Sequence, residues 1–519
     1  METITDNVVR QLERTEPVTD IGLKIKPVKK RMSNRLVKLE RRLENFPGSI
    51  PVSSLLEIIE PQNRMHDIEN AEKTVQEKEE NVLDDFISRN VIPLASAEKL
   101  FEYYRDRLDK YIYEIAQTYT TLETVRSKSE FLAVSICTVS ALHHAECSEL
   151  YDLCYKVLLR LSSEKMTQQN FQLADVVAYC IGAFWLFDLS SLFVSNAHHI
   201  SSELGLHHSY AKAIQGDHEH FERLRLWYLV YVCDHHFSIV YGHASKTRMH
   251  KPLSNWRPYA KCCLSSEADK RLITQICLWE ILDCVFQSLG ADVDERLSDG
   301  ELNSIRKFRE EVISFGVEWH NKLARNKFIG NYPSKGLTLH TKFAELYIAS
   351  HAFRGFKTKS IDLPADLSHI ACKAAMSIVQ TIVHDDELQD ALIGLPLYFS
   401  TMIAFTAVSL VKMILRYSNE SIHFRIETIN ELKQLASKIR KVCTRPAKQH
   451  VIKRISQGLD DLLASSTKTL NLDKQSEPLG VTETDIEALF STSIGNDEDE
   501  WWNNVLQGIL PQKSLNSLL

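Results

Sequence analysis

The sequence predicts an all-α fold, and three observations support that prediction. The chain has only 17 glycines and 14 prolines in 519 residues, about half of the usual ~7% and ~5%. Sheets and hairpins use glycine in their left-handed turns, so few of them are expected. Stretches that alternate with period two are scarce, whereas apolar residues recur at helical spacing between about residues 91 and 470.

Four segments carry the clearest helical spacing, and each is expected to bury one face. The four sets of apolar residues are Phe101, Tyr104, Leu108, Tyr111, Ile112 and Ile115; Ala371, Ala374, Ala375, Ile378, Val379 and Ile382; Leu432, Leu435, Ile439 and Val442; and Ile452, Ile455, Leu459 and Leu462. Such faces pack against other helices in a large multi-helix body.

One uncharged stretch, Ala391 to Val411, is long enough to span a bilayer. It contains Pro396 and several hydroxyl side chains, and no basic cluster accompanies it. The sequence therefore favours a buried core helix over a membrane span.

Charge and cysteine content narrow the class of protein. The net charge of −7 excludes a chain that binds nucleic acid over its whole surface, so any basic site must be local. The 11 cysteines show no framework spacing, and Cys137, Cys180, Cys233 and Cys372 lie in apolar stretches. They are expected to be small buried thiols in a reducing intracellular compartment.

The N-terminal part is predicted to contain a basic flexible arm (1–35), a short coiled-coil helix (36–46) and a linker (47–90). The dimerisation seam has the spacing 3, 4, 3, in Leu36, Leu39, Leu43 and Phe46. Weak candidates for nuclear import or nucleic-acid contact are Lys29, Lys30, Arg31 and Arg35. The alternative is a solvated basic helix without either role.

The C-terminal part (471–519) alternates acidic and apolar residues, which is typical of a disordered activation segment. Residues 481–504 hold seven acidic side chains and no basic one. The candidate activation residues are Leu489, Phe490, Trp501, Trp502 and Leu506. The alternative is a solvated tail whose tryptophans fold back onto the body.

Motifs of enzymes are absent from the sequence. It has no phosphate-binding glycine loop, no dinucleotide fingerprint, no nucleophile elbow and no zinc-protease helix. His218-Glu219-His220, expected in a loop, is a weak metal candidate. No catalytic residue and no metal ligand is assigned, and a helical enzyme or ligand carrier with a dispersed site remains an alternative.

The stretch from His198 to His243 has a recognisable order of residues. Leu204-Gly205-Leu206-His207 precedes Glu222-Arg223-Leu224-Arg225-Leu226-Trp227-Tyr228, which is followed by Tyr231, Asp234, His235, Ser238 and Gly242-His243. This order resembles the regulatory domain, or middle homology region, of the fungal zinc-cluster transcription factors. The resemblance covers about residues 91–470, and its signature residues are Leu204, Gly205, Leu206, His207, Arg223, Leu226, Trp227, Asp234 and Gly242.

The resemblance implies an all-α regulatory domain, with structural rather than catalytic roles for these residues. Trp227, Tyr228 and Tyr231 are expected to anchor the core, and Asp234 to accept hydrogen bonds from the nearby arginines. His235 and His243 replace the family's usual arginines, which predicts a weaker, pH-dependent charge network.

The family's DNA-binding unit holds two zinc ions on six cysteines, and no cysteine precedes Cys137. We therefore expect no cofactor in this chain, and zinc only if a cluster is encoded upstream. The implied function is a nuclear transcription regulator, an activator of RNA polymerase II genes. Its expected partners are the transcription machinery or coactivators, a second copy or a related factor, and a small-molecule effector, but no membrane. Direct DNA contact is left open, and the alternative is a partner or inhibitor of a full-length relative.

Overall fold

The computed structural model describes residues 84–240, 244–247, 251–290, 295–354, 364–414 and 422–474. The chain divides into two compact units, Met1–Asn81 and Val82–Leu519, and all described residues belong to the second. The predicted arm, the coiled-coil seam, the import residues, Gly242 and the activation residues lie outside the described residues. The domain boundaries therefore stay predictions.

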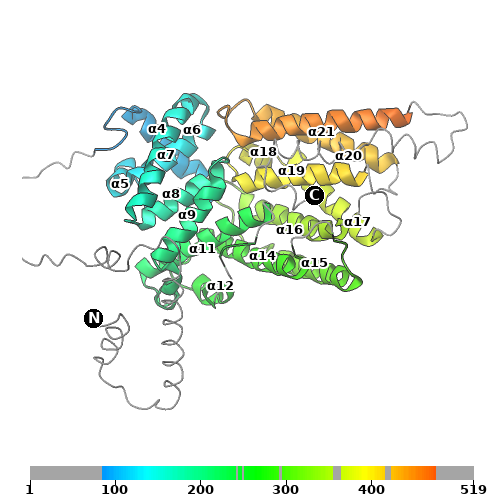
Figure 1. The fold of residues 1–519 in the computed structure, drawn as a ribbon, viewed down its shortest axis with the longest axis horizontal. Helices are drawn as coiled ribbons and strands as arrows, with labels where there is room; N and C mark the ends of the chain where they lie inside the picture. The colour runs from blue at the N-terminus through cyan, green and yellow to red at the C-terminus, as the bar shows by residue number, and fades with distance from the viewer. Residues whose placement is uncertain are drawn as a thin grey trace, which may run out of the picture. The chain divides into compact units, whose positions relative to one another are not determined.

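The described residues form helices joined by turns, and the all-α prediction is confirmed for them (Figure 1). They contain no strand, only an isolated bridge between Asn326 and Gly330. The α-helices are α4 (Leu94–Tyr103), α5 (Leu122–Lys128), α6 (Glu130–His143), α7 (Tyr151–Gln168), α8 (Leu173–Trp185), α9 (Ser190–Glu203), α10 (Tyr210–Ala213), α11 (His218–Val240), α12 (Lys251–Ser254), α13 (Arg257–Ala260), α14 (Glu267–Leu289), α15 (Asp299–Trp319), α16 (Tyr332–Ser350), α17 (Ala365–Val383), α18 (Asp386–Ala391), α19 (Leu397–Lys412), α20 (Ile422–Val442) and α21 (Val451–Lys474). Shorter turns are the π-helical η1 (Tyr104–Leu108) and the 3-10 helices η2 (Ala145–Leu150), η3 (Leu206–Ser209) and η4 (His351–Phe353).

Helix α11 lies between two groups of helices. It contacts α8 and α9 on one side and α14 and α19 on the other, and Figure 1 shows it between these groups. Its side chains are buried on nearly all sides from Leu224 to Phe237. The apolar residues of this stretch point to all sides of the helix, so it has to be covered all round, which explains its central position.

Helices α8 and α9 pack tightly against each other. A Cβ atom at Gly182 would lie 2.4 Å from Cδ2 of Phe193, too close for any side chain. Glycine at this position therefore lets the two helices approach each other closely.

The helical faces predicted for the segments that form α17, α20 and α21 are confirmed. The apolar residues assigned to α17, α20 and α21 are all buried, and these helices pack on one another and on α19. The segment before α21 contacts the end of α6, where the Ala447 amide donates to the Leu142 carbonyl at 3.0 Å.

Helix α19 is a core helix, as the sequence favoured, because every residue from Ala391 to Val408 is buried. Among the described residues, α14 alone is long and apolar enough to span a membrane by length and composition. Of its apolar 18-residue stretch, 56% is buried inside the protein. Core helices meet the same criterion, and α14 carries the buried ionic side chains Asp269 and Arg271.

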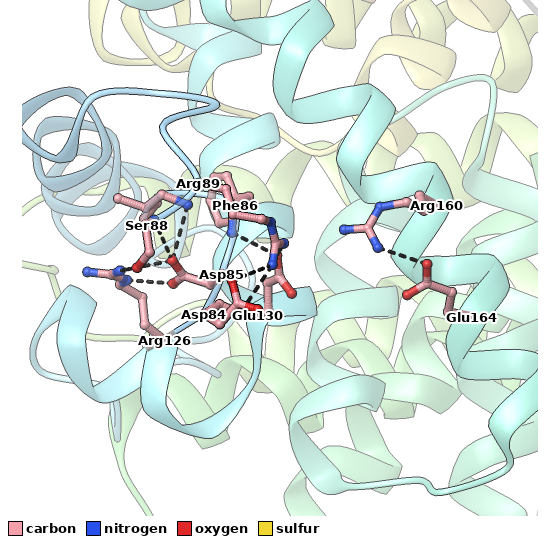
Figure 2. A network of polar contacts seen from close by, with 10 residues as sticks. Asp84, Asp85, Phe86, Ser88, Arg89, Arg126, Glu130, Arg160 and Glu164 are labelled. Carbon is pink, nitrogen blue, oxygen red and sulfur yellow. Dashed lines mark hydrogen bonds and ion pairs between the residues drawn. The ribbon is translucent and has the colours of Figure 1, made fainter. Parts of the chain in front are cut away.

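The first described residues pack onto the helical body (Figure 2). The carboxylate of Asp85 accepts hydrogen bonds from Arg126 Nε at 2.6 Å and from the Ser88 amide at 2.8 Å. The Phe86 amide donates to Glu130 at 2.8 Å, and its ring is fully buried. Burial raises the pKa of Asp85, but hydrogen bonds from Arg126 and Ser88 outweigh burial and leave it below its usual value. Asp85, Phe86 and Ser88 lie within the range 47–90, which the sequence predicts to be a linker.

The predicted helical face from Phe101 to Ile115 is wrong in its second half. The helix ends in the π-turn η1, and turns follow from Asp109 to Thr118. Asp109 Oδ1 accepts from the Ala116 amide at 3.1 Å, which closes a loop instead of a further helical turn. Ile112 and Ile115 are still buried, so the apolar pattern predicted burial correctly and helix incorrectly.

Candidate functional site

The residues Leu204 to His207 mark the end of a helix. Helix α9 ends at Glu203, and Gly205 has φ of +62°, a left-handed conformation that favours glycine. Nη2 of Arg223 donates to the Leu204 carbonyl at 2.5 Å, so an arginine on α11 covers a free carbonyl at the end of α9. Two signature segments are thereby brought together.

The aromatic residues of the signature anchor the core, as expected. The side chains of Leu206 and Leu226 are buried, and Trp227 is 3% exposed. The His207 ring lies 5.5 Å from that of Trp227. The indole therefore joins α11 to the turn after α9.

Asp234 has a different role from the expected one. Its Oδ2 accepts from the backbone amides of Lys246 and Thr247, both at 2.7 Å, and not from Arg223 or Arg225. The buried carboxylate thus fixes the segment that follows α11. His235 is also buried, and burial lowers its pKa. It is therefore neutral near pH 7 and carries no charge in a network there.

Sequence reasoning missed the main polar network of the core. Arg225 Nε donates to Asp269 Oδ1 at 2.8 Å, and the Tyr259 hydroxyl donates to the same oxygen at 2.9 Å. Asp269 also forms a capping box with Ser266 at the start of α14. The Ser-x-x-Asp spacing before α14 was a signal for that cap, but no local pattern links it to Arg225.

Arg225 also fixes the loop from Asp109 to Ala116. Its Nη2 donates to the Tyr113 carbonyl at 2.6 Å and its Nη1 to the Glu114 carbonyl at 3.3 Å. Both loop residues have positive φ, 68° and 57°, an unfavourable conformation for side chains other than glycine. The buried guanidinium therefore offsets strain in this loop.

A small cavity lies where this loop meets α8, α11, α14, α16 and the start of α19. Its volume is about 30 Å³, enough for water-sized groups. Its walls are Tyr111, Tyr113, Phe184, His236, Arg271, Thr274, Gln275, Leu323, Tyr332, Pro333, Gly336, Leu337, His340, Pro396 and Phe399.

Three nearly parallel rings lie beside the cavity. The ring centres of His236 and Tyr398 are 4.4 Å apart, and those of His340 and Tyr398 are 5.6 Å apart. His340 Nδ1 donates to the Gly336 carbonyl at 2.7 Å, whereas its Nε2 has no hydrogen-bond partner. Burial lowers the pKa of His340 to about 4, so this histidine is neutral near pH 7.

The predicted loop at His218-Glu219-His220 is instead the first turn of α11. Asp217 Oδ1 accepts from the His220 amide at 3.0 Å, which caps the helix. In the described part of the chain, no group of three or more histidine, cysteine or acidic side chains is arranged to hold a metal ion.

The fold and the network define the described protein as an all-α body with a small cavity at its core. This chain is similar to a transcriptional activator of proteases, prtT, from Emericella nidulans. The two are 30% identical over 426 residues, which is 80% of this chain and 64% of the relative. No family model matches the sequence. The name transcriptional activator describes the relative, and the zinc cluster and the middle homology region remain inferences from the residues quoted above.

Proposed function

We propose that this chain is a nuclear transcription activator of the fungal zinc-cluster type. The observation that carries the proposal is the similarity to a transcriptional activator along 80% of the chain. Activation of RNA polymerase II genes belongs to the same proposal, because it follows from the resemblance of the signature block.

The acidic tail would carry the activation. Its acidic side chains would keep Phe490, Trp501 and Trp502 accessible in water, and these rings would enter an apolar groove of a coactivator as a short helix. The helical body would act as the controlling scaffold, since its core polar groups fix the helices around α11.

A fusion experiment tests the tail. Residues 480–519 joined to a neutral DNA-binding module should activate a reporter gene in nuclei. Alanine at Phe490, Trp501 and Trp502 should abolish that activity, because the apolar anchors are lost while every acidic residue stays. A matched control replaces Asn503, Asn504 and Gln507 with alanine and should keep the activity. A silent wild-type fusion would contradict the activator proposal.

A second candidate function is a partner or inhibitor of a full-length relative. This sequence has no cysteine before Cys137, and a six-cysteine cluster is what reads DNA in the resembled family. The basic arm alone would give only salt-sensitive contacts with phosphates. The genomic sequence upstream of Met1 separates the two: an in-frame six-cysteine stretch favours the activator, and stop codons favour the partner.

Dimerisation through Leu36, Leu39, Leu43 and Phe46 is part of both candidates. Sedimentation of the full chain should show a dimer, and aspartate at Leu39 and Leu43 should produce a monomer because charged residues cannot pack in the seam. Equal sedimentation of the wild type and this variant would contradict dimerisation through the seam.

A further inference from the structure

Arg271 is a buried cation without an acidic partner. Its side chain is on α14 and the residue is 8% exposed. Nη1 donates to the Lys110 carbonyl at 2.7 Å, and the guanidinium lies 5.4 Å and 5.7 Å from the ring centres of Tyr113 and Tyr332. No carboxylate of the described chain forms an ion pair with it.

Arg225, the neighbouring arginine of the same core, has the acidic partners that Arg271 lacks. Arg225 is fully buried and has Asp269 at 2.8 Å and Glu222 at 3.7 Å. Buried charges in proteins are normally paired, because removing an ion from water is costly without compensation. Arginine cannot lose its proton to avoid that cost. Carbonyl oxygens and aromatic faces compensate Arg271 only in part.

Arg271 also lines the core cavity, whose walls carry polar atoms without partners. Nε2 of His340 and Oε1 of Gln275 are buried and have no hydrogen-bond partner at normal distance. Since His340 Nδ1 donates to a carbonyl, Nε2 is an acceptor, as is the amide oxygen of Gln275. A carboxylate cannot satisfy these two atoms, which suit a water molecule or a hydroxyl group beside it.

We propose that this cavity binds a small carboxylate, whose negative charge pairs with Arg271. The proposal rests on the proposed function and names the chemical class of its effector. A carboxylate matches the planar donor fork of a guanidinium. The volume of about 30 Å³ admits little more than the carboxylate itself. The partly exposed side chains of Tyr111 and Leu323 mark the side on which the rest of the molecule lies.

The site is joined to the strained loop between Asp109 and Ala116. Arg271 binds the Lys110 carbonyl and Arg225 binds those of Tyr113 and Glu114. A carboxylate that draws the Arg271 guanidinium toward the cavity competes with the loop carbonyl for its donors. Binding would therefore change the contacts that this loop makes with α11 and α14.

Acetate is the probe, and the full chain is the sample. Saturation-transfer NMR should show transfer from the protein to the acetate methyl group, and sodium acetate should raise the melting temperature more than sodium chloride at equal ionic strength. Arg271→Gln should weaken acetate binding at least tenfold. Arg306→Gln, at an exposed arginine paired with Asp366, should leave it unchanged.

A folding defect is distinguished by Arg271→Lys, which keeps the positive charge and should bind acetate with reduced affinity while its helical circular dichroism stays native. Equal effects of acetate and chloride on the wild type would overturn the proposal, as would equal acetate binding by the wild type and Arg271→Gln. The assay contains no DNA and no reporter gene, so its failure leaves the activator proposal standing. A silent tail fusion would likewise leave the carboxylate site standing.

Discussion

The guanidinium of Arg225 and the carboxylate of Asp269 form an ion pair at the centre of the helical body, with Nε 2.8 Å from Oδ1 and both side chains almost fully buried. The pair joins α11 to α14, and the same guanidinium binds two carbonyls of the loop after α4. Three parts of the body that are distant in sequence therefore depend on one side chain.

Arg225→Met should destabilise the body by about 3–5 kcal/mol, because it leaves Asp269 as an uncompensated buried charge and removes the donors to the loop. Denaturant unfolding followed by tryptophan fluorescence measures the change. Arg306→Met removes an exposed ion pair with Asp366 and should cost less than about 1 kcal/mol. Equal losses in the two variants would contradict a central role for Arg225.

The contact between Asp85 and Arg126 gives a second prediction. Arg126→Ala should lower the free energy of unfolding by about 2–4 kcal/mol, because the Asp85 side chain is only 4% exposed and would lose its main donor. Limited proteolysis should then cut before α4. Arg160→Ala breaks an exposed pair with Glu164, drawn beside it in Figure 2, and should change stability by less than about 0.5 kcal/mol. Wild-type protease resistance in Arg126→Ala would show that residues 84–93 do not need this pair.

Among the signature residues that the structure describes, Gly205 alone has a left-handed backbone conformation. Gly205→Ala should cost about 1–2 kcal/mol, since φ is +62° and the added Cβ would lie 3.3 Å from His208. Gly300, in the first turn of α15, has an ordinary φ, and an added Cβ would make only an ordinary contact, 3.8 Å from Ser298 Oγ. Gly300→Ala should therefore stabilise the protein by about 0.5–1 kcal/mol. Chemical denaturation of both variants tests the pair, and a neutral Gly205→Ala would refute the strain argument.

Stability should fall as the pH drops from 7 to 5, and His340 should contribute to the loss. Burial lowers its pKa to about 4, whereas the unfolded chain titrates near 6.5. A histidine with a lowered folded pKa stabilises the folded state above its unfolded pKa, and this contribution is lost as the pH falls toward the folded pKa. His340→Gln should therefore lose about 2 kcal/mol less than the wild type between pH 7 and 5.

The comparison with His340→Gln isolates this residue from other groups. His143, with its pKa also lowered to about 4, adds a similar loss in both proteins. Asp109, with its pKa raised to about 6 by burial, gains stability over the same interval and offsets part of it. His320 is exposed, and His320→Gln should keep the wild-type pH profile. A His340→Gln profile parallel to that of the wild type would contradict the prediction.

The sequence predicted those parts of the structure that depend on local patterns. Apolar spacing identified the buried faces of α17, α20 and α21, and the uncharged stretch around Pro396 identified a core helix. The same spacing failed after Leu108, because the loop there is determined by Asp109 and by arginines more than 100 residues away in sequence. Partners at such separations leave no periodic signal.

The core site was predictable only in part for the same reason. The signature indicated Arg223, Trp227 and Asp234 as structural residues, yet the nearest acceptor of Arg223 and the donors to Asp234 are backbone groups that no side-chain pattern specifies. Arg271 lies in an apolar helix without any motif, and only the fold shows that it faces a cavity without a carboxylate partner.

The most direct test of the central claim is transcription from a reporter gene to which the full chain is tethered by a neutral DNA-binding module. We expect strong activation by residues 1–519 or, where the body restrains the tail, by residues 480–519 alone, and none by a chain that ends with α21 at Lys474. A reporter that stays silent with both the full chain and the tail, or one that the chain ending at Lys474 activates equally well, would contradict the claim that this protein is an activator whose acidic tail carries the activity.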